Sequence, residues 1–147
     1  MGWETSKFQR QLFSLIIISS ITNQVLAFDL QSSIHNHKNQ FEKVALDLWD
    51  LAEMGYQETE SVNILSSELK KEGFTITKGV AGIPTAFIAE YSNGGPIIGI
   101  LGEYDALPGL AQSKSPFKEV IDNTTGAGQA CGHHLFGTAS TAAAIAI

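Results

Sequence analysis

The sequence predicts an α/β domain in which helices and a sheet are packed in layers. Two segments with helical periodicity come first, short strands follow, and the chain ends in a helix rich in small residues. The decisive observation is the uninterrupted apolar run at residues 97–101. Such a run is typical of a strand buried on both faces, whereas a strand with one solvated face alternates apolar and polar residues. We therefore expect this strand to lie inside a layered domain.

The composition agrees with a single globular domain and excludes several other classes. Of the 147 residues, 44% are hydrophobic and 16% are charged, a balance that rules out disordered and fibrous proteins. The net charge is −6 and the sequence has no basic stripe, so we expect no nucleic-acid partner. The single cysteine, Cys131, has no second cysteine with which to form an internal disulfide.

The N-terminus has the pattern of a secretory signal peptide. Lys7 and Arg10 precede an apolar run over residues 12–18, and Ala27 ends a short stretch of aliphatic and small residues. The run is too short to span a bilayer comfortably. We therefore expect residues 1–27 to be removed, the product to be periplasmic or secreted, and no stable membrane span to remain. An uncleaved anchor in the membrane interface is the alternative.

Two helices are expected after the leader. Residues 28–40 are polar and predict a short linker. Apolar residues at helical spacing then predict a helix over 41–53 and a second helix over 59–72. Thr59 is expected to cap the second helix, and Gly73 fits its C-terminal end.

Short strands are expected over residues 74–78 and 85–91, separated by a turn-prone stretch. The sequence Asn93-Gly94-Gly95 is typical of a hairpin, so the second strand is expected to pair with residues 97–101. Residues 108–128 contain several glycines and prolines without sustained periodicity, which predicts a long surface loop.

The first of two polar clusters follows the apolar strand directly, at Gly102 to Pro108. Ligand sites of open α/β sheets lie beyond the carboxyl ends of the strands, where Glu103 and Asp105 fall. Their alternate spacing places both carboxylates on the same side of an extended chain. An acidic turn without a chemical role is the alternative.

The second polar cluster, residues 126–134, holds Cys131, His133 and His134 in a glycine-rich loop before a helix expected over 138–147. A thiolate is favoured near a helix N-terminus, and Cys131 and His133 flank one glycine, so both are able to reach one cation. Zinc and similar divalent metals accept this mixture of sulfur and nitrogen ligands. Two ligands do not complete a site, and a buried thiol beside surface histidines is the alternative.

Taken in this order, the two clusters resemble a known family. The chain resembles the amidohydrolase branch of metallopeptidase family 20, which includes aminoacylases, carboxypeptidases and indole-acetyl-amino-acid hydrolases. The likeness runs from about Phe41 to Ile147 and is carried by GYQE at 55–58, GVAGIPTAF at 79–87, GILGEYDALPGL at 99–110 and CGHHLFGTA at 131–139. It implies that residues 41–147 are the N-terminal part of a layered helix–sheet–helix metallo-exopeptidase catalytic domain. It also implies that residues 41–147 do not include the smaller domain through which full-length members form homodimers.

The resemblance also implies roles for individual residues. Cys131 and His133 correspond to the first two ligands of a centre that holds two divalent ions, zinc or manganese. Asp105 corresponds to the catalytic-site carboxylate that orients a metal-binding histidine, and Glu103 lies where other branches carry a ligand. The implied reaction is hydrolysis of the amide bond of an N-acyl or N-aroyl amino acid or dipeptide, such as aminobenzoyl-glutamate, by water that a Glu base activates.

The sequence also departs from the family pattern. The remaining ligands and the Glu base of the family come later in a longer chain, so we expect a polypeptide ending at Ile147 to be an inactive fragment. Gln129 stands where relatives often have His, and His134 where many have Asn or Asp. Two other functions are open: a hydrolase with Cys131 as nucleophile and His133 or His134 as base, and a non-catalytic binding protein that retains half of the fold. A chelator separates the two enzymes, because metal removal abolishes metal-dependent hydrolysis and spares thiol chemistry.

Overall fold

The computed structural model describes residues 30–147. The predicted signal peptide and its cleavage point after Ala27 lie outside the described residues. The chain divides into two units after Asn36, and the described part of the first unit, residues 30–36, is helical although it falls in the expected linker. No helix in the described part of the chain is both long and apolar enough to cross a membrane.

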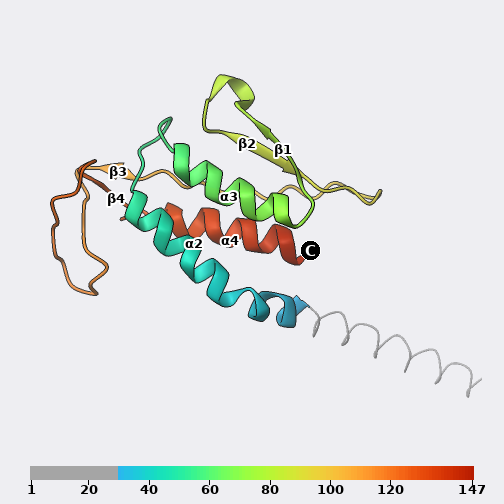
Figure 1. The fold of residues 1–147 in the computed structure, drawn as a ribbon, viewed down its shortest axis with the longest axis horizontal. Helices are drawn as coiled ribbons and strands as arrows, with labels where there is room; N and C mark the ends of the chain where they lie inside the picture. The colour runs from blue at the N-terminus through green and yellow to red at the C-terminus, as the bar shows by residue number, and fades with distance from the viewer. Residues whose placement is uncertain (1–29) are drawn as a thin grey trace, which may run out of the picture. The chain divides into compact units, whose positions relative to one another are not determined.

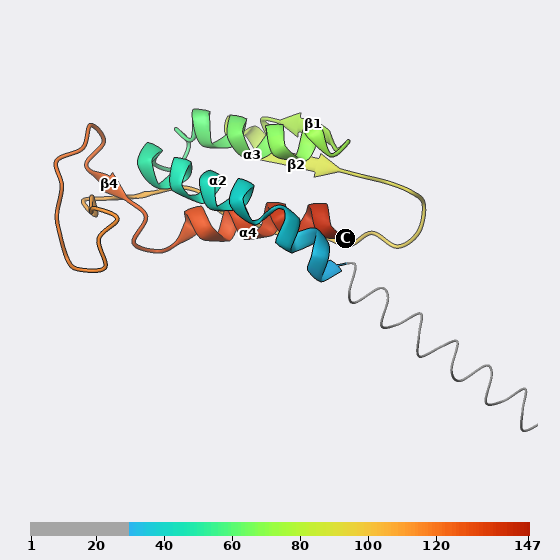
Figure 2. The ribbon, with the colours of Figure 1, turned by 60° about the horizontal axis from the view of Figure 1, so that its bottom comes forward.

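Three helices carry the core of the second unit: α2 (Lys38–Leu51), α3 (Thr59–Lys71) and α4 (His133–Ala146). Helix α4 packs against both α2 and α3, and the three lie together in both views of the ribbon (Figures 1 and 2). The two predicted helices before residue 73 are confirmed within a few residues at each end. Their apolar stripes meet in one buried cluster made of Phe41, Val44, Leu48 and Leu65.

The N-terminal cap of α3 differs from the prediction. Thr59 is the first helical residue rather than the cap, and the cap position is taken by Glu58, whose side chain makes no capping bond. Instead, the Glu53 carboxylate accepts hydrogen bonds from the backbone N–H groups of Glu60 (3.0 Å) and Ser61 (2.8 Å). A carboxylate at this end complements the helix dipole and satisfies otherwise unpaired N–H groups. Glu58 is therefore left free for another contact.

The strands form two small antiparallel pairs. Strand β1 (Thr75–Lys78) pairs with β2 (Phe87–Glu90), with Thr75 opposite Glu90, and a single 3₁₀ turn (Val80–Gly82) lies between them. Strand β3 (Leu107–Pro108) pairs with β4 (Ala127–Gly128) and so closes the base of the predicted surface loop. The expected pairing of the second strand with residues 97–101 is wrong, because those residues belong to no strand and β2 is paired with β1 alone among the described strands.

Residues 97–101 do not form the buried strand that the sequence predicts. They belong to no strand among residues 30–147, and Ile97, Ile98 and Leu101 are 98%, 66% and 75% exposed. In Figure 1 the segment lies on the trace that leads from β2 back to β3, which passes behind α3. A continuous apolar run becomes buried only when strands flank both edges and layers cover both faces, and the described residues do not provide this. They show a mixed α/β arrangement of helices and small antiparallel sheets.

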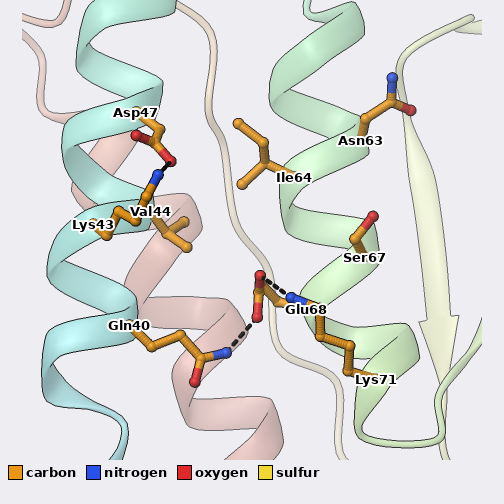
Figure 3. Close-up of a pocket in the computed structure, with 9 residues that line it drawn as sticks. All are labelled: Gln40, Lys43, Val44, Asp47, Asn63, Ile64, Ser67, Glu68 and Lys71. Carbon is orange, nitrogen blue, oxygen red and sulfur yellow. Dashed lines mark hydrogen bonds and ion pairs between the residues drawn. The ribbon is translucent and has the colours of Figure 1, made fainter.

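A groove of about 530 Å³ lies between α2 and α3 (Figure 3). Its polar side chains largely satisfy one another: Gln40 and Lys71 both donate to Glu68, and Lys43 pairs with Asp47 at 2.5 Å. None of the residues singled out by the sequence lines this groove. The candidate chemistry lies elsewhere, at the start of α4.

Candidate functional site

The turn before α4 determines where the two adjacent histidines lie. Helix α4 begins at His133, earlier than the predicted Thr138, so both histidines belong to its first turn. The N-cap is Gly132 with φ of +83°, a left-handed conformation that glycine adopts without steric cost. Glycine has no capping side chain, and Gln129 supplies the cap because its Oε1 accepts a hydrogen bond from the His134 N–H (3.1 Å). The Gln129 carbonyl also accepts from the Gly132 N–H (2.9 Å), which closes the turn.

His133 lies between the two carboxylates of the first cluster. Its Nδ1 is 2.8 Å from Asp105 Oδ1, and its Nε2 is 2.9 Å from Glu103 Oε2. The His133 side chain is 18% exposed, whereas Glu103 is 52% exposed. The structure thus brings Asp105 next to His133 and places both carboxylates on the same side of their segment, as the alternate spacing predicts.

The two contacts of His133 restrict its protonation state. A neutral imidazole carries one N–H, so hydrogen bonds to both carboxylates require the doubly protonated ring. A neutral ring forms only one of these two bonds; if its proton is on Nδ1, Asp105 accepts it and the Nε2 lone pair faces Glu103. This second state is the arrangement of a metal-binding histidine, whose other N–H is held by a carboxylate that fixes the tautomer and the ring orientation. The geometry around His133 therefore suits a histidine that binds a metal ion through its Nε2.

The two donor atoms lie closer together than two ligands of one zinc ion. At bond lengths of ~2.1 Å and a tetrahedral angle, two ligand atoms lie roughly 3.4 Å apart, whereas His133 Nε2 and Glu103 Oε2 are separated by 2.9 Å, the length of a direct hydrogen bond or ion pair. Among residues 30–147, no group of three or more His, Cys, Asp or Glu side chains is arranged to hold a metal ion. Cys131 is an exposed free thiol. The metal-ligand roles of Cys131 and His133 stay predictions.

His134 differs from its neighbour in both burial and contacts. It is 7% exposed, and its ring meets the ring of Trp49 on α2 edge-on, with centroids 5.1 Å apart. Burial lowers the pKa of His134 from its ordinary value of 6.5. Its Nδ1 and the Gln129 Nε2 are buried without a hydrogen-bond partner among the described residues. The sequence left the role of His134 open, and the structure shows a packing contact between the first turn of α4 and α2.

Tyr104 is a residue of this region that the sequence did not single out. It lies between Glu103 and Asp105 in the chain, and its ring packs with the core and with Phe87 (centroids 6.1 Å apart). Its hydroxyl donates a hydrogen bond to the carbonyl of Thr85. Burial first, and then the negative charges of Glu58 and Asp105, raise the pKa of Tyr104 to about 12. The sequence signal that could have found Tyr104 is the alternation of side chains along an extended segment, which places this aromatic residue on the face opposite its two acidic neighbours.

The segment that carries the carboxylates lies directly against α4. A Cβ on Gly137 would lie 2.8 Å from the Glu103 carbonyl oxygen and 3.0 Å from the Tyr104 Cβ, and a Cβ on Gly102 would lie 3.4 Å from the Gly137 Cα. Small residues on both sides thus permit close backbone contact. Gly137 follows His133 by about one helical turn, so this close contact lies next to the site.

Comparison with known proteins gives two curated relatives, while no family model matches the chain. The chain is 40% identical over 118 residues to one subunit of the p-aminobenzoyl-glutamate hydrolase of Escherichia coli (strain K12), a match that covers 80% of this chain and 24% of that protein. It is 36% identical over 96 residues to N-acetylcysteine deacetylase of Bacillus subtilis (strain 168), covering 64% of this chain and 24% of that protein. The matches thus span about a quarter of each relative's length. These two relatives confirm the resemblance of the chain to an N-terminal part of the metallopeptidase family 20 amidohydrolases.

Proposed function

We propose that this chain supplies a histidine ligand and its orienting carboxylate to a metal-dependent hydrolase of amide bonds. The observation that carries the proposal is His133, held between Asp105 and Glu103. The names of the two relatives describe hydrolysis of an aroyl amide and of an acetyl amide, each formed with an amino acid. We therefore propose an N-acyl or N-aroyl amino acid or dipeptide as the substrate class.

Each residue of the cluster has a defined role in this proposal. Asp105 accepts the Nδ1–H of His133 and fixes the orientation of the ring. Glu103 is a second oxygen donor or a proton acceptor at the same position, 2.9 Å from Nε2. Cys131, an exposed thiol before the helix, supplies a sulfur ligand. A bound divalent ion, zinc or manganese, supplies electrophilic polarisation of the amide carbonyl.

The alternative with Cys131 as nucleophile has less support from the contacts. Both ring nitrogens of His133 face carboxylates, and His134 is buried against Trp49. Within residues 30–147, no hydrogen bond joins Cys131 to either histidine. A cysteine nucleophile needs a base within hydrogen-bond reach, so the metal-dependent proposal is the better account of this cluster.

The test joins residues 28–147 to the part of the E. coli hydrolase that follows its matched region. We expect this fusion to release glutamate from p-aminobenzoyl-glutamate in the presence of Mn²⁺ or Zn²⁺, and a chelator to abolish the release. His133→Ala should abolish it as well, while His35→Ala, at an exposed histidine, serves as the matched control. Hydrolysis that survives both chelator and His133→Ala would overturn the proposal.

A second measurement does not depend on turnover. Binding of Zn²⁺ to the full chain is followed by titration calorimetry, with Asp105→Asn as the variant. The amide keeps the shape of the carboxylate but holds the required tautomer of His133 less firmly, and loss of such a supporting group typically costs about 10- to 100-fold in metal affinity. Unchanged affinity in Asp105→Asn would contradict the orienting role.

A further inference from the structure

The two carboxylates contact His133 although their own segment is not part of a sheet. Residues 97–105 belong to no strand in the described part of the chain. The segment is tied at Leu101, whose carbonyl accepts from the Ser140 hydroxyl (2.6 Å), and at Ala106, whose N–H donates to the Glu53 carbonyl (2.7 Å). In a regular sheet, ladder hydrogen bonds would fix each residue between these two points. Here something else must fix the residues that carry the site.

Tyr104 provides that link at the centre of the segment. Because neighbouring side chains of an extended chain point to opposite faces, its ring enters the core while Glu103 and Asp105 reach His133. The hydroxyl donates a hydrogen bond to the carbonyl of Thr85, a buried residue 19 positions earlier in the chain. The ring and the hydroxyl thus hold one residue whose two neighbours both contact the imidazole.

The acceptor of this bond is itself firmly held. Thr85 is 6% exposed, and its hydroxyl donates to Glu58 Oε2 at 2.5 Å. Glu58 is 8% exposed and stands at the N-cap position of α3, where the Glu53 carboxylate makes the capping bonds. A buried network of this kind is rigid when each member has a partner. It connects the carboxylate segment to α3, and α3 packs against α4, the helix that begins at His133.

We propose that Tyr104 is a positioning residue whose phenol, held by Thr85 and Glu58, keeps Glu103 and Asp105 in contact with His133. The importance of Tyr104 for turnover rests on the proposed function, whereas its effect on the contacts of His133 does not. Hydrogen bonds weaken steeply with distance and angle, so a segment released at Tyr104 loses the 2.8 Å contact between Asp105 and His133 before the fold itself is lost.

The experiment records the ring N–H signals of the histidines in the full chain by ¹H–¹⁵N NMR. A proton held between Nδ1 and a carboxylate gives a downfield, slowly exchanging signal, which His133→Asn identifies by its disappearance. Tyr104→Phe removes only the hydroxyl and keeps the ring in the core. We expect it to speed exchange of the His133 Nδ1–H by at least about tenfold, while Tyr91→Phe, at a tyrosine 58% exposed, leaves the signal unchanged.

Two further variants separate positioning from general damage. Thr85→Val removes the hydroxyl that bonds to Glu58 and keeps the carbonyl that Tyr104 uses, so it should act in the same direction as Tyr104→Phe, more weakly. Glu58→Gln keeps an acceptor for the Thr85 hydroxyl, so its His133 signal should resemble that of the wild type. Glu58→Ala removes the acceptor and should exchange faster. If Tyr104→Phe does not fold, Thr85→Val and the Glu58 pair decide the question.

An unchanged His133 signal in folded Tyr104→Phe and in Thr85→Val would overturn the positioning role. Failure of the hydrolase fusion would leave this comparison intact, because the NMR measurement requires neither metal nor substrate. Conversely, an active fusion whose turnover is insensitive to Tyr104→Phe, together with an unchanged signal, would reject the positioning role and retain the proposed function.

Discussion

Gly137→Ala tests how α4 lies against the segment that carries the two carboxylates. Gly137 has no positive φ and lies within the helix, so alanine by itself should stabilise α4 by about 1 kcal/mol. The added Cβ would lie 2.8 Å from the carbonyl oxygen of Glu103, 3.0 Å from the Cβ of Tyr104 and 3.3 Å from the Cδ1 of Leu65. The nearest of these atoms belongs to the backbone, so no side-chain rotation relieves the contact.

The expected net effect is destabilisation. Inserting a methyl group into a well-packed region costs about 1–3 kcal/mol. The middle of that range exceeds the gain in helix propensity, so we expect a free energy of unfolding lower by about 1 kcal/mol. The same displacement moves Glu103 and Asp105 away from the helix that carries His133. The Asp105–His133 contact should therefore weaken along with the stability.

The assay is urea unfolding followed by circular dichroism, with Gly99→Ala as the matched control. Gly99 lies in the exposed apolar segment, a Cβ there meets nothing within 4 Å, and its φ is not positive. The same chemical change at Gly99 should leave the midpoint nearly unaltered. A Gly137→Ala variant as stable as the wild type, or more stable, would show that α4 and the segment that carries the carboxylates are not in close backbone contact.

Three further predictions concern ionisation and processing. Burial lowers the folded-state pKa of His134 below 6.5, so the stability tied to its neutral ring is present above pH 6.5 and is lost as the pH falls below it. Denaturation midpoints measured on both sides of pH 6.5 should show this loss. An equal change of the midpoint with pH in His134→Asn would contradict it. Because the pKa of Tyr104 is raised from 10.0 to about 12, ultraviolet titration should show one tyrosine ionising near 12 that is absent in Tyr104→Phe, and stability should decline as the pH rises from 10 toward 12. Finally, the N-terminal sequence of an exported product should begin at Phe28 or close to it; an intact Met1 in a cytoplasmic fraction would refute cleavage.

The sequence alone determined those features that depend on neighbours along the chain. Helical periodicity predicted α2 and α3, and the glycine at 73 ended the second helix as expected, with φ of +89°. The spacing of Glu103 and Asp105 placed both carboxylates on one side of an extended chain, and both contact one histidine. Periodicity and turn chemistry act over a few residues, so they are visible without knowledge of the fold.

The features that the sequence missed depend on partners far along the chain. The apolar run at 97–101 predicted burial, but burial is decided by which strands and layers surround it, and in residues 30–147 its side chains remain exposed. The hairpin pattern at 93–95 did not predict the pairing of β2, which is with β1, because a local turn signal does not determine whether the residues after it form a strand.

The positioning of the site was likewise decided by tertiary structure. Gln129, rather than the residue at the N-cap, caps α4, because Gly132 has no side chain and a residue three positions earlier reaches the buried N–H of His134. Tyr104 meets Thr85, 19 positions away in sequence, and Thr85 meets Glu58, 27 positions away. Such contacts depend on how the helices pack, and packing is a property of the whole set of buried side chains. The sequence thus names the groups able to do chemistry, while the tertiary structure determines which of them touch.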